Sequence, residues 1–416
     1  MSAVTASGQL PEDRAFKQYL QGRRRIGWVW QSLFLLATCI GILALMALLY
    51  NIVDGAFGYV AYEDKVDAAT ISDRPLEGLS QEELVAVLQA NLSRGAFNKL
   101  NDEQPFEQRS QGDVYNLVLE RVLQRKVVAA WSLTDSLTKR AAIEAELAKE
   151  HPNATLVFRS WLSLKFLQEP MSSQPLDAGV RTAILGSLWL IAITIAVALP
   201  IGVGAAIYLQ EYADHTRWYN RLIETNIYNL AGVPSIVYGI LGLAIFVRAL
   251  EFFSSGAMFG VTDSNGRTII SAALTMALLI LPLVIVNAQE AIKAVPDSFR
   301  QASYGLGATK WQTIWAHILP NALPGVLTGS ILAVSRAIGE TAPLIVIGAS
   351  TFITVDPSSV FSKFTALPIQ IYTWTSRPLV GFRNIAAAAI LALLALLLTL
   401  NAAAILLRNR FSRRLY

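Results

Sequence analysis

Residues 323–349, LPGVLTGSILAVSRAIGETAPLIVIGA, decide the fold because they form an apolar segment long enough to cross a membrane. A helix needs about 20 residues to span the hydrocarbon core of a bilayer. Arg336 and Glu340 are the two charged residues of this segment. A charge within a bilayer costs about 2.5–3.5 kcal/mol on insertion scales, and such residues usually face a bundle interior or a water-filled path. The pair therefore needs a partner or a ligand.

The composition of the whole chain agrees with a membrane protein. Apolar residues make up 54% of the sequence and charged residues 15%, and the mean hydropathy is +0.45. Because lipid offers the backbone no hydrogen-bond partners, spans of this kind form helices. The sequence therefore predicts an all-α integral membrane protein with six transmembrane helices, at about 28–52, 182–209, 227–247, 268–288, 323–349 and 384–407.

Basic residues set the expected orientation. Five Arg and Lys residues precede the first span, and the tail that begins at Arg408 adds four. Since basic residues are retained on the cytoplasmic side, both termini, residues 1–27 and 409–416, are expected in the cytoplasm; for a bacterial inner membrane, the opposite side is the periplasm. The sequence shows no basic cluster with interleaved aromatic residues, so nucleic acid is not an expected partner.

Residues 53–178 separate the first two spans and differ from the rest in charge. They hold 19 acidic against 13 basic residues, a net charge of −6, whereas the remainder carries +10. LSQEELVAVLQANL opens with a capping box, Ser80 and Glu83, and two further segments have helical spacing, while ATLVFRSWLSL predicts a strand followed by a short helix. We expect a soluble, mainly helical insertion domain in the periplasm, without metal-ligand spacing. Its role stays open between docking or shielding and a neutral insert.

The segment 289–329, QEAIKAVPDSFRQASYGLGATKWQTIWAHILPNALPGVLTG, predicts two short helices joined by a glycine turn. The first helix begins at Pro296 and is interrupted at Gly305 and Gly307. Thr309 caps a second helix that is expected to end at Pro320. Such a pair is either a compact knob that contacts another protein or an interfacial helix pair on lipid headgroups.

This loop resembles the cytoplasmic signature of permease subunits of ABC importers, which runs Glu-Ala-Ala, three residues, Gly, nine residues, Ile-x-Leu-Pro. The spacing is kept, while the residues at 301, 303 and 317 depart from the consensus. The matching positions are Gln301, Ala302, Ser303, Gly307, His317, Leu319 and Pro320.

Together with NLAGVPSIVYGILGLAIF at 229–246 and AAAAILALLALLLTLNAAAILLRNRF at 386–411, the loop is similar to permeases of phosphate-specific ABC importers of the PstA type. The resemblance implies a type I importer permease core over 179–408, a homologous permease partner, an ABC ATPase dimer, and a periplasmic phosphate-binding protein. It implies that the 290–322 loop couples to the ATPase through Gln301, Ala302, Ser303, Gly307, Ala308, Thr309, Leu319 and Pro320. The chain has no GxxxxGK[ST] phosphate loop, so we expect a non-catalytic subunit without a cofactor, with ATP on the partner.

Within the spans, Arg336 is the predicted anion site, since a planar guanidinium binds two phosphate oxygens at once. Glu340 is predicted to orient it, Thr341 to donate a hydroxyl, and Ser235 to line the path beside a helix break. The alternatives are a self-neutralising ion pair that fixes the fifth span to its neighbours and, for Thr341, a hydrogen bond to its own helix.

The sequence also admits three rival functions. The first is an ABC permease for molybdate or sulfate. The second is an ion-coupled secondary transporter, which needs coupling carboxylates within spans, and Glu340 is the one acid well inside a predicted span. The third is a signalling receptor, for which the sequence has no recognisable output domain.

Overall fold

The computed structural model describes residues 14–66, 70–71, 74–103, 105–123, 126–214, 216–261 and 265–412. The predicted terminal segments 1–27 and 409–416 thus lie partly outside the described residues. Two compact units are present, Met1–Asp54 and Gly55–Tyr416. The first unit is almost entirely helix α1 (Arg14–Ala56), whose apolar part, Tyr19–Ala56, is long enough to cross a membrane.

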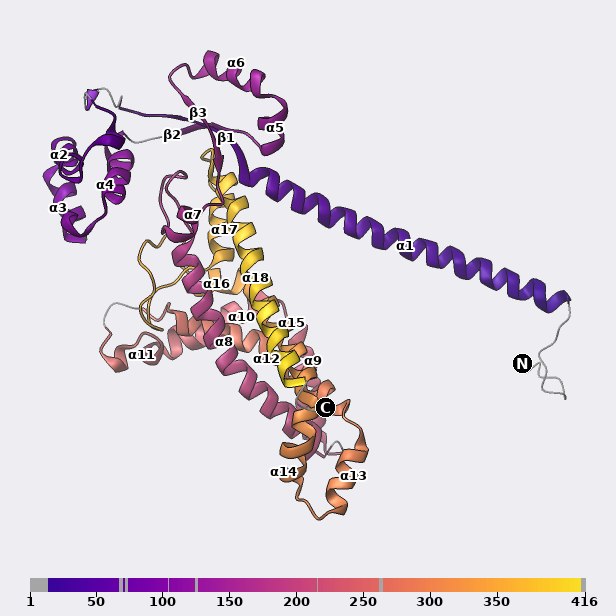
Figure 1. The fold of residues 1–416 in the computed structure, drawn as a ribbon. Helices are drawn as coiled ribbons and strands as arrows, with labels where there is room; N and C mark the ends of the chain where they lie inside the picture. The colour runs from indigo at the N-terminus through magenta and orange to yellow at the C-terminus, as the bar shows by residue number, and fades with distance from the viewer. Residues whose placement is uncertain are drawn as a thin grey trace. The chain divides into compact units, whose positions relative to one another are not determined.

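In the second unit, helix α12 (Ile269–Lys293) is the centre of the membrane-spanning part (Figure 1). It packs against α8 (Arg181–Ile207) and α15 (Leu319–Gly339), and α15 packs against α18 (Phe382–Ser412). Small residues allow the close approach. A Cβ atom on Gly329 would lie 2.3 Å from the Asn287 Cβ of α12, and one on Gly325 would lie 2.8 Å from the Ala291 Cβ. These four helices account for the predicted spans 182–209, 268–288, 384–407 and the first part of 323–349.

The expected break near Gly232 and Pro234 in the predicted span 227–247 is confirmed as a bend of 106°. The segment consists of α9 (Trp218–Ala231) and α10 (Ser235–Gly242), and a π-helical stretch, η6 (Leu243–Ala249), extends α10. Gly232 ends α9, and Pro234 lacks an N–H group and disfavours helical geometry at the residue before it. The bent pair is either a broken span or a re-entrant loop.

The predicted helix over 323–349 is also interrupted. Helix α15 ends at Gly339, the backbone of Glu340 is extended (φ −75°, ψ 124°), and α16 (Ala342–Ile347) begins two residues later. Pro343 explains the break, since its ring in a continuous helix would clash with the carbonyl group four residues earlier, that of Gly339. In the first turn of a new helix the same proline fits without cost. Arg336 and Glu340 therefore lie at a helix break rather than on one face of a continuous span.

Part of the insertion is a three-stranded antiparallel sheet in the order β2-β1-β3. The predicted strand and helix at 154–164 are confirmed as β3 (Thr155–Ser160) and α7 (Leu164–Gln168). Strands β1 (Phe57–Glu63) and β2 (Lys126–Ala130) were not predicted. The sheet shares a core with α17 (Leu367–Thr375) and α18, in which Trp161, Phe166, Trp374 and Phe382 are buried. This part of the insertion thus shares its core with the helices α17 and α18.

A second part of the insertion has a core of its own. We call residues 74–123 the helical lobe; it contains α2 (Gln81–Asn91), α3 (Arg94–Glu103), α4 (Gln111–Val118) and the π-helical η4 (Leu119–Leu123). Leu84, Leu88 and Val114 are buried in its core. The predicted capping box is confirmed, since the Ser80 N–H donates to the Glu83 carboxylate at 2.7 Å. Helices α5 (Leu133–Thr138) and α6 (Arg140–Glu150) follow β2, as their helical spacing predicted.

The remaining elements are short and lie between the longer ones. Two of them are π-helical: η5 (Tyr208–Tyr212) continues α8, and η8 (Ile314–Ile318) leads into α15. The short elements are η2 (Leu76–Gly78), η3 (Phe106–Gln108), η5 (Tyr208–Tyr212), α11 (Glu251–Ser254), η7 (Ala257–Phe259), α13 (Asp297–Gly305), α14 (Lys310–Thr313) and η8 (Ile314–Ile318).

Candidate functional site

The two helix breaks meet in the structure. Helix α10, which follows the first break, packs against α16, which follows the second. The contact is close: a Cβ atom on Gly239 would lie 2.6 Å from the Cα atom of Pro343. Tyr238 donates its hydroxyl to the Leu230 carbonyl at 2.8 Å and so connects α10 back to the end of α9. The chain therefore gathers two irregular backbone segments at one place.

Arg336 and Glu340 lie at this meeting point, in the last turn of α15 and directly after it. The Arg336 Nε atom lies 3.4 Å from Glu340 Oε1, and the Arg336 side chain is 46% exposed. Among the described residues, its Nη1 and Nη2 atoms have no hydrogen-bond acceptor. The predicted pair thus forms, but through one weak contact that leaves the two parallel N–H directions of the guanidinium unused.

The two predicted hydroxyl residues stand at the starts of the two short helices. Ser235 is the first residue of α10, and Thr341 precedes the first residue of α16. Both are half-buried, and no hydrogen bond of either hydroxyl is found within the described part of the chain. The back-bond considered for Thr341 is therefore not observed. Neighbouring Ser335 donates to Asn401 of α18 at 2.8 Å, which fixes the end of α15.

The 289–322 loop forms the predicted knob. Helix α13 ends at Gly305, and Gly307 adopts a left-handed conformation with φ +81°, which favours glycine. Thr309 and Gln312 form a capping box at the start of α14. The buried Ser303 hydroxyl pairs with Thr313 at 2.8 Å and joins the two helices. Of the predicted coupling residues, Gln301, Ala302, Gly307 and Thr309 are exposed, Ala308, Leu319 and Pro320 are half-buried, and Ser303 is buried.

The second helix of the knob does not end at Pro320 as predicted. Helical structure continues without interruption from Lys310 through Pro320 to Gly339. The π-helical η8 directly before the proline opens the turn with which the ring would otherwise clash. One helical segment of 30 residues therefore connects the knob to Arg336.

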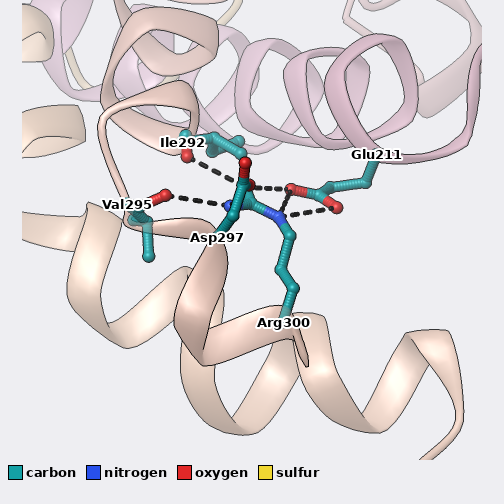
Figure 2. A network of polar contacts seen from close by, with 5 residues as sticks. All are labelled: Glu211, Ile292, Val295, Asp297 and Arg300. Carbon is teal, nitrogen blue, oxygen red and sulfur yellow. Dashed lines mark hydrogen bonds and ion pairs between the residues drawn. The ribbon is translucent and has the colours of Figure 1, made fainter. Parts of the chain in front are cut away.

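Figure 2 shows the network that holds the knob to the transmembrane helices, and sequence reasoning missed it. The Arg300 guanidinium donates to Glu211 at the end of η5 at 2.7 Å, and to Asp297 at 3.0 Å. It also donates to the Ile292 carbonyl in the last turn of α12 at 3.2 Å and to the Val295 carbonyl just after that helix at 2.9 Å. The hydrogen bond to Glu211 raises the pKa of Arg300 above its ordinary value. The one sequence signal for this network was that Glu211 and Arg300, an acid and a base, lie in two loops expected on the same side of the membrane.

The outer surface of the knob carries apolar side chains. Leu306, between the two glycines of the turn, is 89% exposed, and Phe299 and Tyr304 are each 43% exposed. Exposed apolar residues gathered on a compact knob are typical of a surface that contacts another protein. Elsewhere, no group of three or more His, Cys, Asp or Glu residues that could hold a metal ion occurs in the described ranges.

Residues 198–415 match the family described as binding-protein-dependent transport system inner membrane component. The chain belongs to this family. It is 36% identical over 239 residues to "Phosphate transport system permease protein PstA 1" of Mycobacterium tuberculosis (strain ATCC 25618 / H37Rv), covering 57% of this chain and 71% of that protein. Against PstA of Yersinia pestis it is 34% identical over 243 residues, covering 57% of this chain and 73% of the relative.

A second permease, named PstC, matches nearly as well. PstC of Haemophilus influenzae (strain ATCC 51907 / DSM 11121 / KW20 / Rd) is 33% identical over 244 residues, covering 52% of this chain and 73% of that protein. The predicted resemblance to PstA-type ABC permeases and the multi-pass membrane fold are confirmed. The family match begins at residue 198, so it contains both helix breaks and the knob but not the insertion.

Proposed function

We propose that the chain is the permease subunit of an ATP-driven importer of inorganic phosphate. It forms the translocation path together with a homologous permease. A periplasmic binding protein delivers the anion, and a separate ATPase dimer hydrolyses ATP. The observation that carries this proposal is the Arg336 guanidinium, which reaches a carboxylate through Nε alone and keeps Nη1 and Nη2 for a ligand.

The chemistry of the site suits an oxyanion. A guanidinium forms two parallel charge-assisted hydrogen bonds with phosphate, as with a carboxylate. Glu340, with its side chain 19% exposed, reduces the positive field at the site, so that the anion binds weakly enough to leave again. Ser235 and Thr341 supply hydroxyl donors at the two adjoining helix starts. Irregular backbone within a membrane is tolerated where it lines such a path.

The knob supplies the coupling. Leu306, Phe299 and Tyr304 form the surface that contacts the ATPase, together with the exposed predicted coupling residues. Arg300 connects the knob to the ends of α8 and α12, while the helix from Lys310 to Gly339 connects it to Arg336. Movement of the knob on ATP binding therefore reaches the anion site through continuous helix. Buried Ser303 stabilises the knob from within rather than contacting the partner.

The arrangement also supports the proposed orientation in the inner membrane of a bacterium. The sheet of the insertion adjoins the start of α8, and the network around Glu211 adjoins its end. The insertion and the knob thus lie at opposite ends of one membrane-spanning helix. With the knob on the ATPase side, the insertion is periplasmic and both termini are cytoplasmic.

The test is an ATPase assay on the complex purified with its neighbouring gene products and reconstituted in lipid vesicles. We expect vanadate-sensitive hydrolysis that a phosphate-loaded binding protein stimulates, accompanied by phosphate uptake. Stimulation by molybdate or sulfate in place of phosphate would indicate an importer for another oxyanion. Uptake that needs no ATP and collapses when an ionophore removes the ion gradient would indicate a secondary transporter.

A further inference from the structure

A pocket of about 370 Å³ lies where the segment before α12 meets the segments after α16 and before α17. Two cationic side chains, Arg267 and Lys363, line it together with Asn265, Ser350 and Thr351. Its described lining contains no carboxylate. The two pocket cations thus differ from Arg181, whose guanidinium is paired with the Asp356 carboxylate at 3.0 Å.

Backbone hydrogen bonds hold the segments that carry the pocket. The Ile269 N–H donates to the Ser362 carbonyl at 3.2 Å, and the Ile270 N–H donates to the Val360 carbonyl at 3.0 Å. The Ser350 N–H in turn donates to the Phe364 carbonyl at 2.9 Å. The residues on either side of Lys363 are therefore fixed, one to the start of α12 and the other to the segment after α16.

Gly348 places the Arg267 side chain. Gly348 has φ +100°, and a Cβ atom on it would lie 2.7 Å from Arg267 Cδ and 2.9 Å from Nε. The arginine therefore lies across a position that only glycine leaves open. Across the described ranges, neither Arg267 nor Lys363 has an ion-pair or hydrogen-bond partner. Two cations are thus held beside one pocket, and no neighbouring acid within its described lining neutralises them.

The pocket is close to the Arg336 site along the chain. Gly348 directly follows α16, and Thr341 directly precedes it. A six-residue helix measures about 9 Å, so one short helix separates the two places. Because Arg267 precedes α12 and the knob follows it, the pocket lies at the end of α12 opposite the knob. This is the side from which an imported anion arrives.

We propose that this pocket is an outer anion site, which receives a tetrahedral oxyanion released by the binding protein and holds it before it reaches Arg336. The inference rests on the proposed function and adds a second anion site to it. Exposed cations in a concave surface concentrate an anion without binding it tightly. Such weak binding suits a transfer site, from which the ligand must move on.

The first test measures the local field without transport. Thr351→Cys is introduced with Cys39→Ser, which removes the one native cysteine, and the assembled complex is treated with an anionic and a cationic thiol reagent of equal size. We expect the anionic reagent to react at least about tenfold faster at low ionic strength. Millimolar inorganic phosphate is expected to slow the reaction, and the complex with Thr351 retained gives the background.

Removing both cations is the decisive variant. In Arg267→Gln, Lys363→Gln the preference for the anionic reagent is expected to vanish, and phosphate is expected to give no protection. The matched control is Arg383→Gln, which removes an exposed cation from a different pocket near the start of α18 and should leave the preference intact. If the preference survives in the double variant, or if Arg383→Gln removes it equally, the pocket is not an anion site.

Measurements of phosphate uptake then distinguish a failure of the outer anion site from a failure of the proposed importer function. With saturating loaded binding protein, the double variant is expected to take up phosphate several-fold more slowly, while Arg383→Gln matches the wild type. A defect that more binding protein fully restores would mean that the two cations contact that protein, and it would overturn the anion site. A wild-type complex that does not transport phosphate would reject the proposed function, whereas the reagent preference tests the pocket by itself.

Discussion

Two arginine–glutamate pairs in this molecule differ in how fully the arginine is satisfied. Arg300 donates to two carboxylates and two carbonyl groups, and its pair with Glu211 leaves 16% and 6% of the two side chains exposed. Arg336 makes one 3.4 Å contact with Glu340 and is 46% exposed. Since a guanidinium has five N–H donors, the first arginine is saturated by the protein and the second is not. The first has the properties of a structural connection, whereas the second is the proposed anion site.

The sequence around the two pairs does not reveal this difference. Arg336 and Glu340 are four residues apart and attract attention within an apolar segment, whereas Arg300 and Glu211 are separated by 89 residues. The more conspicuous pair thus makes fewer contacts. Neutralising the charges of each pair tests whether the two arginines have different roles.

The largest effect is expected for Arg336→Gln. Loss of two charge-assisted hydrogen bonds to the anion should lower phosphate uptake by about 100-fold or more, with the complex still assembled. Arg336→Lys should recover little, since an ammonium group lacks the two-pronged geometry. The measurement is uptake of radiolabelled phosphate per assembled complex.

The double variant Arg336→Gln, Glu340→Gln decides between a site and an ion pair. If the pair only neutralises itself, removing both charges restores uptake to the wild-type rate, because no charge is left unpaired. If Arg336 binds the anion, the double variant stays inactive and Glu340→Gln alone is the milder change. Wild-type uptake by the double variant would contradict the anion site.

The second largest effect, on stability and assembly, is expected for Arg300→Gln. It leaves the buried Glu211 carboxylate without its partner, which typically costs about 3–5 kcal/mol. We expect a lower unfolding temperature and loss of the ATPase on co-purification. Adding Glu211→Gln should restore much of both, in contrast to the double change at the Arg336 site. Equal behaviour of the two double variants would show that both pairs have the same role.

A smaller effect is expected for Gly307→Val, which strains the turn of the knob because Gly307 has φ +81°. The Arg300 network should keep α13 in place, so thermal stability should change by less than for Arg300→Gln. Co-purification of the ATPase should fall several-fold. Gly27→Val, a glycine replacement within α1 and outside the knob, serves as the control. Normal coupling in the Gly307 variant would mean that the knob is not the contact with the ATPase.

The smallest effect is expected from removing the helical lobe. Glu63 of β1 pairs with Lys126 of β2, so a short turn can replace residues 64–125 without altering the strand register. The lobe has its own core, and neither arginine pair contacts it among the interactions described. Uptake is therefore expected to change less than twofold. A larger loss, with the complex assembled and stable, would assign the lobe a part in transport.

Sequence patterns predicted the helices and the break near Gly232 and Pro234, but not the break at Pro343. Five apolar segments became membrane-spanning helices because hydropathy over about 20 residues reflects the thickness of the bilayer. The mean hydropathy of such a window changes little when it contains one proline. The break at Pro343 was therefore not predicted, although the proline is present in the sequence. Strand β1 follows α1 without a turn and pairs with β2, more than 60 residues later, so no local pattern indicated it. Arg300 escaped for the same reason, since its partner is distant in sequence.

The sheet near the start of α8 has a mechanical consequence. Its shared core with α8, α17 and α18 joins these helices at one end, and Asn384 of α18 donates to the Gly55 carbonyl at 2.8 Å. Helix α8 extends about 40 Å from that joint. A small rotation at the joint becomes a large displacement at the far end, beside Glu211 and the knob. The sheet then acts as the pivot about which α8 rotates. Distances between pairs of spin labels should stay nearly constant close to the sheet over the ATP cycle and should change most near Arg300.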